Sequence, residues 1–506
     1  MRKNILILTG LKLIASVIGL TYSILQVRFF GASAMVDTFF VAMAAVTMIT
    51  SLMQSGQLAE VFLPEYLKQK LIKGSKAAHD LLSVVINRLL VFVFASLLLI
   101  YFAAPFVLTL LGPGLASKYR SFGVEIFQIS LVAVLFTVIS SFVTSTLNAE
   151  EVFGRAELTA IVNSVLSLVL LLLLYKSMGI YVLIISMLVG KLVEFLMGVY
   201  FLHKIGYKYR IIWRLKDYDI LPLFKTLFTT STYVGATQLY ASAITAMASF
   251  LPAGSLSIYN YVLQLSNKGS SIIMGPISTV FFSKIAKIVV KQRDNLESHI
   301  RRPFFSVFAI YFIIFCFILI VGNDFLHLLW NKRSLTEDQF LLAYWMLCLN
   351  FFGYLFSSTG YIFRKLVVAI GEANLLYRYW TFIQIFSAAY TVVAIYFGHT
   401  WGLASVLVVN MISLSMVSFV ISAKNKVNTK LLFTQLFFTD KNFIFLSVTI
   451  AGTLLILFLL NFFQYGFFVG FLIKALLLSI VIGSVLLSLY KSELLTNLKN
   501  MISNLK

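Results

Sequence analysis

Apolar residues in this chain fall in long blocks and are not dispersed along it. Examples are Leu89–Leu111, Leu131–Leu147, Leu158–Tyr175 and Phe443–Leu460. Each block is about long enough to cross the apolar core of a bilayer, which takes roughly 20 residues. Backbone groups in lipid must find their hydrogen-bond partners within the protein, so the blocks are expected to be helices. No segment has the alternating pattern of an outer-membrane barrel.

The pattern predicts an all-α polytopic membrane protein with about fourteen transmembrane helices. The predicted spans lie near residues 5–29, 34–63, 87–111, 122–147, 157–175, 178–202, 221–251, 256–282, 303–330, 338–363, 374–397, 401–423, 442–461 and 466–489. The first span follows the basic residues Arg2 and Lys3 directly, and we interpret it as a retained helix and not as a cleaved signal peptide.

The composition agrees with this class of protein. Hydrophobic residues make up 60% of the 506 positions and charged residues 12%, and the mean hydropathy is +0.95. Soluble domains carry roughly 25% charged residues. A soluble globule of this length could not keep so much apolar sequence in solution.

The formal net charge of +21 is concentrated in alternate loops. The basic loops hold Lys68, Lys70, Lys73, Lys76 and Arg88; Lys204, Lys208, Arg210, Arg214 and Lys216; Lys284, Lys287, Lys291, Arg293, Arg301 and Arg302; and Lys424, Lys426, Lys430 and Lys441. The loops between them hold few basic residues. This distribution follows the positive-inside rule and predicts that both termini are cytoplasmic. Anionic lipid headgroups account for the charge, so no nucleic-acid partner is expected.

Sequence motifs for catalysis or metal binding are absent. Cys316 and Cys348 lie inside predicted spans and form no CxxC pair, and the five histidines have no metal-ligand spacing. The chain has no P-loop, GxSxG or HExxH motif, and its outer loops are short. We therefore predict a protein that is not an enzyme and has no cofactor or metal.

Two six-span halves resemble each other. The turn at residues 30–37, between spans one and two, aligns without gaps with the turn at residues 251–258, between spans seven and eight. This predicts two parallel six-helix repeats around a central cavity, with two C-terminal helices added, as in transporters that rock between two access states. The expected domains are an N-terminal lobe at 1–205, a C-terminal lobe at 206–425, and two further helices with a tail at 426–506.

Polar residues form stripes at helical spacing on the first two spans of each half. The candidate substrate-binding residues on or beside these stripes are Lys12, Ser16, Gln26, Gln54, Gln238, Gln264, Asn267 and Lys268. Small and hydroxyl residues also allow close helix packing, and that alternative stays open for any single stripe. A water-filled cavity between the halves explains all four stripes together.

Charges inside predicted spans are costly and usually functional. Lys12 and Lys268 lie on or beside the cavity stripes, whereas Arg28 faces away from Lys12 and is assigned a structural role. Asp37 is also assigned a structural role, because the dipole of its own helix favours an acid in the first turn. Lys191 and Glu194 are three residues apart and are expected to neutralise each other.

Segments around the two aligned turns resemble a known family. Residues 29–42 with Phe62-Leu63-Pro64, and residues 248–261 with 277–282, are similar to spans one, two, seven and eight of the MurJ/MviN lipid II flippases. That family belongs to the multidrug/oligosaccharidyl-lipid/polysaccharide exporter superfamily. The resemblance implies fourteen helices and a role in moving a precursor of peptidoglycan or another cell-wall polysaccharide.

The chain departs from the family pattern at positions that the resemblance makes important. Family members carry cavity arginines on spans one, two and eight, where this chain has Ser16, Tyr22, Thr50 and Gln264. They often carry an acid on span seven, where this chain has Ile244. Lys12 and Lys268 each lie one turn cytoplasmic of an arginine position, so the positive charge is displaced and not lost.

We therefore expect a flippase for a polyprenyl-diphosphate-linked saccharide in a bacterial cytoplasmic membrane, with a coupling ion or the membrane potential as the energy source. The alternatives are a multidrug/cation antiporter of the same superfamily, which calls for buried acids, and a non-transporting membrane scaffold, which needs no convergent polar stripes. A membrane glycosyltransferase or polymerase would need catalytic acids or a large outer loop.

Overall fold

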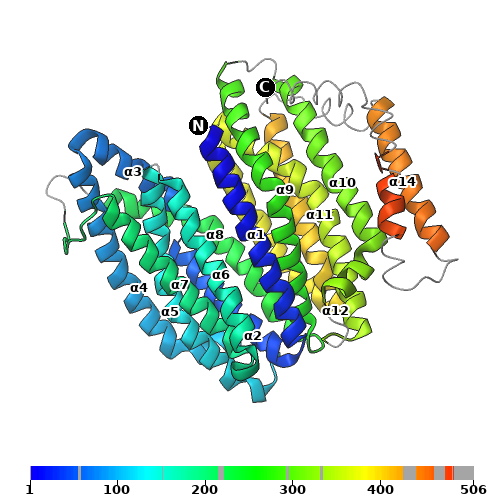
Figure 1. The fold of residues 1–506 in the computed structure, drawn as a ribbon, viewed down its shortest axis with the longest axis horizontal. Coiled ribbons are helices and arrows are strands. Elements are labelled where there is room, and N and C mark those ends of the chain that lie inside the picture. Colours follow the sequence, from blue (N-terminus) through cyan, green and yellow to red (C-terminus); the bar gives the residue numbers. More distant parts are fainter. Residues whose placement is uncertain are drawn as a thin grey trace. The chain divides into compact units, whose positions relative to one another are not determined.

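The computed structural model describes residues 2–54, 58–150, 152–214, 221–291, 296–330, 334–424, 440–460, 473–480 and 482–483. The regular elements in these ranges are helices (Figure 1). The helices are α1 (Arg2–Phe30), α2 (Ala34–Gln54), α3 (Leu58–Lys73), α4 (Ser75–Leu111), α5 (Ser117–Ala149), α6 (Phe153–Met178), α7 (Tyr181–Lys204), α8 (Leu221–Ala248), α9 (Ser255–Lys291), α10 (Leu296–Leu329), α11 (Glu337–Ile370), α12 (Ala373–Lys424) and α14 (Asp440–Leu460). Nine helices in the described part of the chain are long and apolar enough to cross a membrane. The prediction of an all-α polytopic membrane protein is confirmed.

Most predicted spans match one helix, and the differences have local causes. The predicted second span at 34–63 corresponds to α2 and the beginning of α3, which continues to Lys73 in the predicted basic loop. The predicted spans at 374–397 and 401–423 both lie in α12, where His399 interrupts the helical backbone with φ 47° and ψ −125°. The predicted last span at 466–489 lies mostly outside the described residues.

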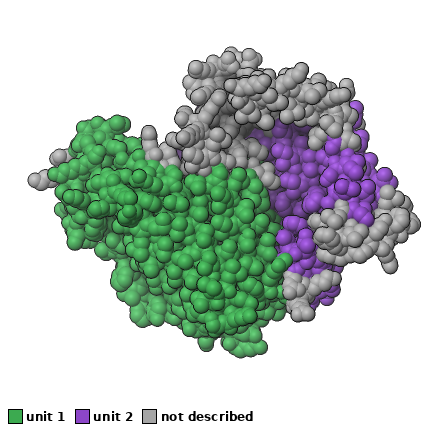
Figure 2. Space-filling model, in the orientation of Figure 1, with its two compact units in different colours: residues 1–276, 333–335, 377–406 green, residues 277–332, 336–376, 407–506 purple. Residues whose placement is uncertain are grey.

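The chain divides into two compact units, coloured separately in Figure 2. Unit 1 comprises residues 1–276, 333–335 and 377–406, and unit 2 comprises residues 277–332, 336–376 and 407–506. Within unit 1, α5 packs against α2, α3, α4 and α7, while α6 packs against α1 and α7. Within unit 2, α10 packs against α11 and α14. The two six-helix lobes expected from the sequence repeat stay a prediction.

Helix α3 continues beyond the predicted span because its polar side chains bind the end of α5. Lys70 forms an ion pair with Glu150 at 2.7 Å, and the Tyr66 hydroxyl donates to the other oxygen of Glu150 at 2.8 Å. Burial alone would raise the pKa of Glu150, but the bonds from Lys70 and Tyr66 outweigh burial and hold that pKa below its usual value. These contacts tie a charged, partly exposed helix to the membrane bundle.

Helices α6 and α7 are joined by a polar contact inside the apolar bundle. The predicted pair of Lys191 and Glu194 is confirmed at 2.8 Å, and the Asn163 amide donates to the same Glu194 oxygen at 2.7 Å. Gly190 lies beside this group, and a Cβ there would come within 2.1 Å of the Asn163 side-chain oxygen. The glycine therefore permits the approach that the polar contact requires.

Candidate functional site

The polar stripes of α1 and α9 meet within unit 1. The hydroxyls of Ser16 and Ser271 lie 3.5 Å apart. One turn along each helix, the Lys268 ammonium donates to the backbone carbonyl of Gly19 and to the Ser23 hydroxyl, the second at 3.0 Å. We call these five residues the α1–α9 contact.

Gly19 shapes this contact because it has no side chain. A Cβ at this position would come within 3.0 Å of the Lys268 nitrogen and 3.4 Å of its Cε. The Ser23 hydroxyl itself donates to the Gly19 carbonyl at 3.0 Å, so the three groups form a closed set of bonds. An alanine at position 19 would have to move the ammonium.

The α1–α9 contact leaves the charge of Lys268 available. The Gly19 carbonyl and the Ser23 hydroxyl are both uncharged, and Lys268 forms no ion pair within the described parts of the chain. An ammonium has three N–H donors, and two are directed at Gly19 and Ser23. The neighbouring Asn267 is exposed. This arrangement orients a half-buried cation on a polar face, which suits an anionic group of a ligand.

The other predicted site residues have different surroundings. Gln238 and Gln264 are half-buried, whereas Gln26 is buried. Lys12 lies in α1 and Gln54 at the end of α2, but their side chains lie outside the described residues. The structure thus brings Ser16 and Lys268 together in one contact and leaves the arrangement of the remaining candidates as a prediction.

Asp37 makes a contact that the sequence did not predict. It lies in the first turn of α2, as expected, but its carboxylate binds the beginning of α9. The backbone N–H of Gly254 donates to one oxygen at 2.6 Å, and the N–H of Ser257 donates to the other at 2.7 Å. The Ser257 hydroxyl also donates to the carboxylate. The carboxylate therefore also interacts with the N-terminus of a second helix, which sequence periodicity could not show.

The turn between α1 and α2 also contacts α9. Gly31 has φ +60°, a conformation that favours glycine, and its carbonyl accepts a bond of 2.8 Å from the Tyr261 hydroxyl of α9. Ring contacts between Phe40 and Tyr261 lie beside it. The two turns that align in the sequence are thus in direct contact through α2 and α9.

Comparison with known proteins decides the family. The family model described as lipid II flippase MurJ matches residues 27–478, which is most of the chain. The chain belongs to the MurJ family. The predicted resemblance to the MurJ/MviN lipid II flippases is confirmed.

Named MurJ relatives are distant in sequence. A probable lipid II flippase MurJ of Borreliella burgdorferi is 24% identical over 378 residues, which cover 73% of each chain. A probable lipid II flippase MurJ of Buchnera aphidicola is 23% identical over 290 residues, or 56% of this chain. The chain thus spans 57% of the length of the Buchnera protein, little more than half.

Solved structures show that the MurJ fold extends over nearly the whole chain. A lipid II flippase MurJ in an inward closed conformation matches 97% of this chain and all of its own, with a TM-score of 0.79 and 19% identity. A multidrug resistance MATE transporter of the MOP superfamily covers 84% of this chain and 94% of its own, with a TM-score of 0.63 and 16% identity. The likeness is one of fold.

Residues that the sequence resemblance places at the family's cavity-arginine positions make neutral contacts in this chain. The Tyr22 hydroxyl lies 3.1 Å from the Ser186 hydroxyl of α7, and the Thr50 hydroxyl donates to its own helix at the Val46 carbonyl. Ile244, at the position of the family's span-seven acid, is buried. In the described residues, no group of three His, Cys, Asp or Glu side chains is placed to hold a metal ion.

Proposed function

We propose that this protein moves a polyprenyl-diphosphate-linked saccharide across a bacterial cytoplasmic membrane by alternating access. The substrate is lipid II or another cell-surface glycan precursor, and an ion gradient or the membrane potential supplies the energy. Membership of the MurJ family supports the substrate class, since the relatives named above are probable lipid II flippases.

The observation that carries the proposal is the orientation of Lys268. Its ammonium is fixed by the Gly19 carbonyl and the Ser23 hydroxyl on a face that also carries the exposed Asn267. A diphosphate presents several oxygens to such a cation, and Asn267 and Gln264 supply amide donors for phosphate or sugar oxygens. Lys12 is the second cation of the site, one turn cytoplasmic of Ser16 in α1.

Lysine instead of arginine changes how the headgroup is held. An arginine grips phosphate oxygens with a planar, bidentate fork, whereas an ammonium acts as a compact point charge. The site therefore tolerates more variation in headgroup geometry than an arginine-lined one. This agrees with a substrate range that includes glycan precursors other than lipid II.

The antiporter alternative requires a buried acid that is available to a cation. In the described part of unit 1, Asp37 accepts bonds from the beginning of α9, and Glu194 is paired with Lys191 and Asn163. Both acids are occupied by partners within the protein. This favours the flippase over the drug/cation antiporter.

The test is complementation in a strain that depends on this protein. We expect Lys12→Ala and Lys268→Ala each to abolish or strongly reduce rescue at normal membrane levels, and Arg at either position to restore it in part. Lys424→Ala is the matched control, because Lys424 is an exposed lysine at the end of α12, and it should rescue fully. Full rescue by the double alanine variant at positions 12 and 268 would rule out these cations as the diphosphate site.

A further inference from the structure

The segment at residues 207–214, which follows α7, lies against α4 without forming a helix or strand. The buried Asn87 of α4 holds this segment by its backbone and by one side chain. The Asn87 amide nitrogen donates to the carbonyls of Arg210 and Ile212, at 3.1 and 2.9 Å. The Asn87 oxygen accepts a bond from the Tyr209 hydroxyl. Both N–H groups and the oxygen of this amide are therefore used to fix one segment.

The 207–214 segment runs along α4 toward the apolar block of that helix. Its first residue, Tyr207, is buried, and its hydroxyl lies 3.0 Å from the Ser83 hydroxyl. Further along, the Trp213 carbonyl accepts two bonds from the Arg88 guanidinium, at 3.3 and 3.0 Å. Arg88 directly precedes the apolar block at Leu89–Leu111. The segment therefore ends at the level where α4 begins to face lipid.

The side chains at this level suit the boundary between lipid and water. Val91 and Phe92, just after Arg88 in the membrane-spanning α4, are exposed. In the 207–214 segment, Ile211 and Trp213 are 75% and 50% exposed. Water disfavours apolar surface of this size, whereas tryptophan is enriched among lipid headgroups. The exposed apolar side chains of the segment thus continue the lipid-facing surface of α4.

The same segment is basic. Lys208, Arg210 and Arg214 are exposed, and residues 203–214 contain no aspartate or glutamate. Arg210 is paired with Asp80 at 3.5 Å, but within the described residues neither Lys208 nor Arg214 forms an ion pair. Basic residues close to a membrane are attracted to its anionic lipids. Two unpaired cations and two exposed apolar side chains therefore lie together at the headgroup level.

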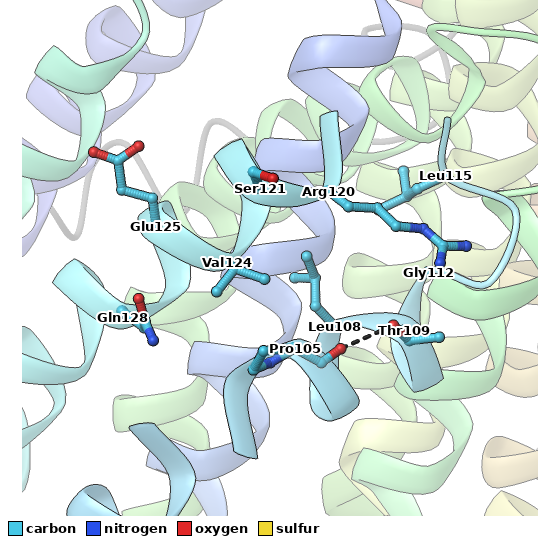
Figure 3. Close-up of a pocket in the computed structure, with 10 residues that line it drawn as sticks. All are labelled: Pro105, Leu108, Thr109, Gly112, Leu115, Arg120, Ser121, Val124, Glu125 and Gln128. Atoms are coloured by element: carbon cyan, nitrogen blue, oxygen red, sulfur yellow. Dashed lines mark hydrogen bonds between the residues drawn. The ribbon is translucent and has the colours of Figure 1, made fainter. Parts of the chain in front are cut away.

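At the other end of α4 the described charges are arranged differently. A cavity of about 500 Å³ lies there, and Pro105 of α4 and Arg120 and Glu125 of α5 are among the residues that line it (Figure 3). Figure 3 shows the Arg120 and Glu125 side chains directed to opposite sides. The two charges have opposite signs and do not form a basic surface. Arg120 is exposed, so it serves below as a control for the removal of a cation.

We propose that the 207–214 segment is a binding surface for anionic phospholipid. Lys208 and Arg214 bind the phosphate groups, and Ile211 and Trp213 lie among the headgroups and the beginnings of the acyl chains. The rest of the acyl chains lies along the exposed apolar side chains of α4. A lipid fits this surface better than a soluble protein does, because the surface continues into a helix face that contacts the bilayer.

The experiment measures which lipid lies beside the segment when the full-length protein is reconstituted in vesicles. A fluorescent label is attached through Val91→Cys, which lies one turn from Asn87 on α4 and leaves the segment unchanged. The native cysteines Cys316 and Cys348 are buried. Quenching by brominated phosphatidylglycerol is compared with quenching by brominated phosphatidylcholine of identical acyl chains.

We expect phosphatidylglycerol to bind beside the label about tenfold more tightly than phosphatidylcholine. A tenfold difference corresponds to about 1.4 kcal/mol, which is the scale of attraction between one or two basic residues and an anionic surface. Lys208→Gln combined with Arg214→Gln should remove this preference. Asn87→Ala should weaken it although every cation is kept, because the segment loses the side chain that holds it.

Matched controls separate this surface from the general attraction of a basic protein for anionic lipid. Arg120→Gln removes one exposed cation at the other end of α4 and should keep the wild-type preference. A label attached through Leu99→Cys, at an exposed position in the middle of α4, should be quenched equally by both lipids.

Three results would overturn the proposal. Equal quenching by the two lipids at position 91 would show that no anionic lipid is selected. A preference that survives Lys208→Gln with Arg214→Gln, at a wild-type melting temperature, would assign the attraction to other cations. A preference of the same size at position 99 would show enrichment around the whole helix. Quenching does not depend on transport, so each of these results leaves the proposed function untouched.

Discussion

Gly19 and Lys268 are 249 positions apart in the chain, and the glycine determines where the lysine can reach. The Lys268 ammonium lies against the α1 backbone because no Cβ separates them. Its two acceptors fix the direction of the charge without cancelling it. In a membrane protein such a cation is costly to bury, so its polar partners stabilise it while the charge stays free for a ligand.

At this scale we expect Gly19→Ala to impair transport more than folding. The new Cβ would lie 3.0 Å from the Lys268 nitrogen and displace the end of a flexible side chain, which costs little stability. Complementation should fall well below wild type, while the melting temperature of the purified protein changes by only a few degrees. Gly10→Ala in the same helix is the control, because nothing lies within 4 Å of a Cβ there, and it should rescue fully.

Full rescue by Gly19→Ala would contradict this expectation. It would mean that the Lys268 ammonium can leave the Gly19 carbonyl without loss of transport. The α1–α9 contact would then serve packing, the alternative that the sequence leaves open for a single stripe.

Part of this residue-level chemistry is readable from the sequence. The period of polar residues predicts that Ser16 and Lys268 share a polar surface, and the structure places both in the α1–α9 contact. The partner of Asp37 is not readable, because its carboxylate meets backbone N–H groups of residues 254 and 257. Backbone donors carry no sequence signal, and the contact depends on how two distant helices pack.

At the scale of elements, the contact between α6 and α7 depends on glycine and a small polar set. Gly190 lets Asn163 and Ser167 of α6 approach α7, and Ser167 donates to the Ser186 carbonyl at 3.1 Å. Small residues of this kind allow membrane helices to pack closely. The close approach in turn lets Asn163 reach Glu194.

We expect Gly190→Ala to destabilise unit 1 by about 1–3 kcal/mol, the usual cost of forcing extra volume into a packed interior. The Cβ would overlap the side chains of Asn163 and Ser167, at 2.1 and 2.7 Å. Gly235→Ala in α8 meets nothing within 4 Å, and removing a helical glycine there should leave stability unchanged or raise it by about 0.5–1 kcal/mol. Unfolding in mixed micelles measures both. Equal stability of the two variants would show that α6 and α7 can separate at no cost.

Element boundaries show where sequence reasoning stops. The apolar block predicts where α4 crosses the membrane, but the helix begins at Ser75, twelve residues before the predicted span. Polar residues such as Asp80 and Asn87 continue the helix because they have partners: Asp80 with Arg210, and Asn87 with the carbonyls of Arg210 and Ile212. A hydropathy profile identifies segments that are suited to contact lipid. It therefore does not identify the part of a helix that is stabilised by polar contacts.

At the scale of the whole molecule, the spans and the MurJ fold could be predicted from the sequence, because the apolar blocks and the two similar turns at residues 30–37 and 251–258 are visible in the residues themselves. The chain's orientation in the membrane stays a prediction, made from the basic residues of alternate loops. Its two native cysteines, Cys316 and Cys348, are both buried. We therefore expect the native cysteines not to interfere with labelling of thiols introduced at exposed positions.

We expect thiol labelling of intact cells to place both termini in the cytoplasm. Ala253→Cys lies in the exposed turn between α8 and α9, which has no basic residue, and should react with a membrane-impermeant maleimide. Ser75→Cys lies at the exposed start of α4 beside Lys73 and Lys76, and should react only after the membrane is permeabilised. The physical reason is that a loop rich in lysine and arginine is held on the side of anionic lipid headgroups.

Permeabilised cells, in which both sites should label, control for burial of either thiol. Labelling of Ser75→Cys but not Ala253→Cys from outside would invert the topology, and it would place Lys12 and Lys268 in the wrong half of the membrane to receive a substrate made in the cytoplasm.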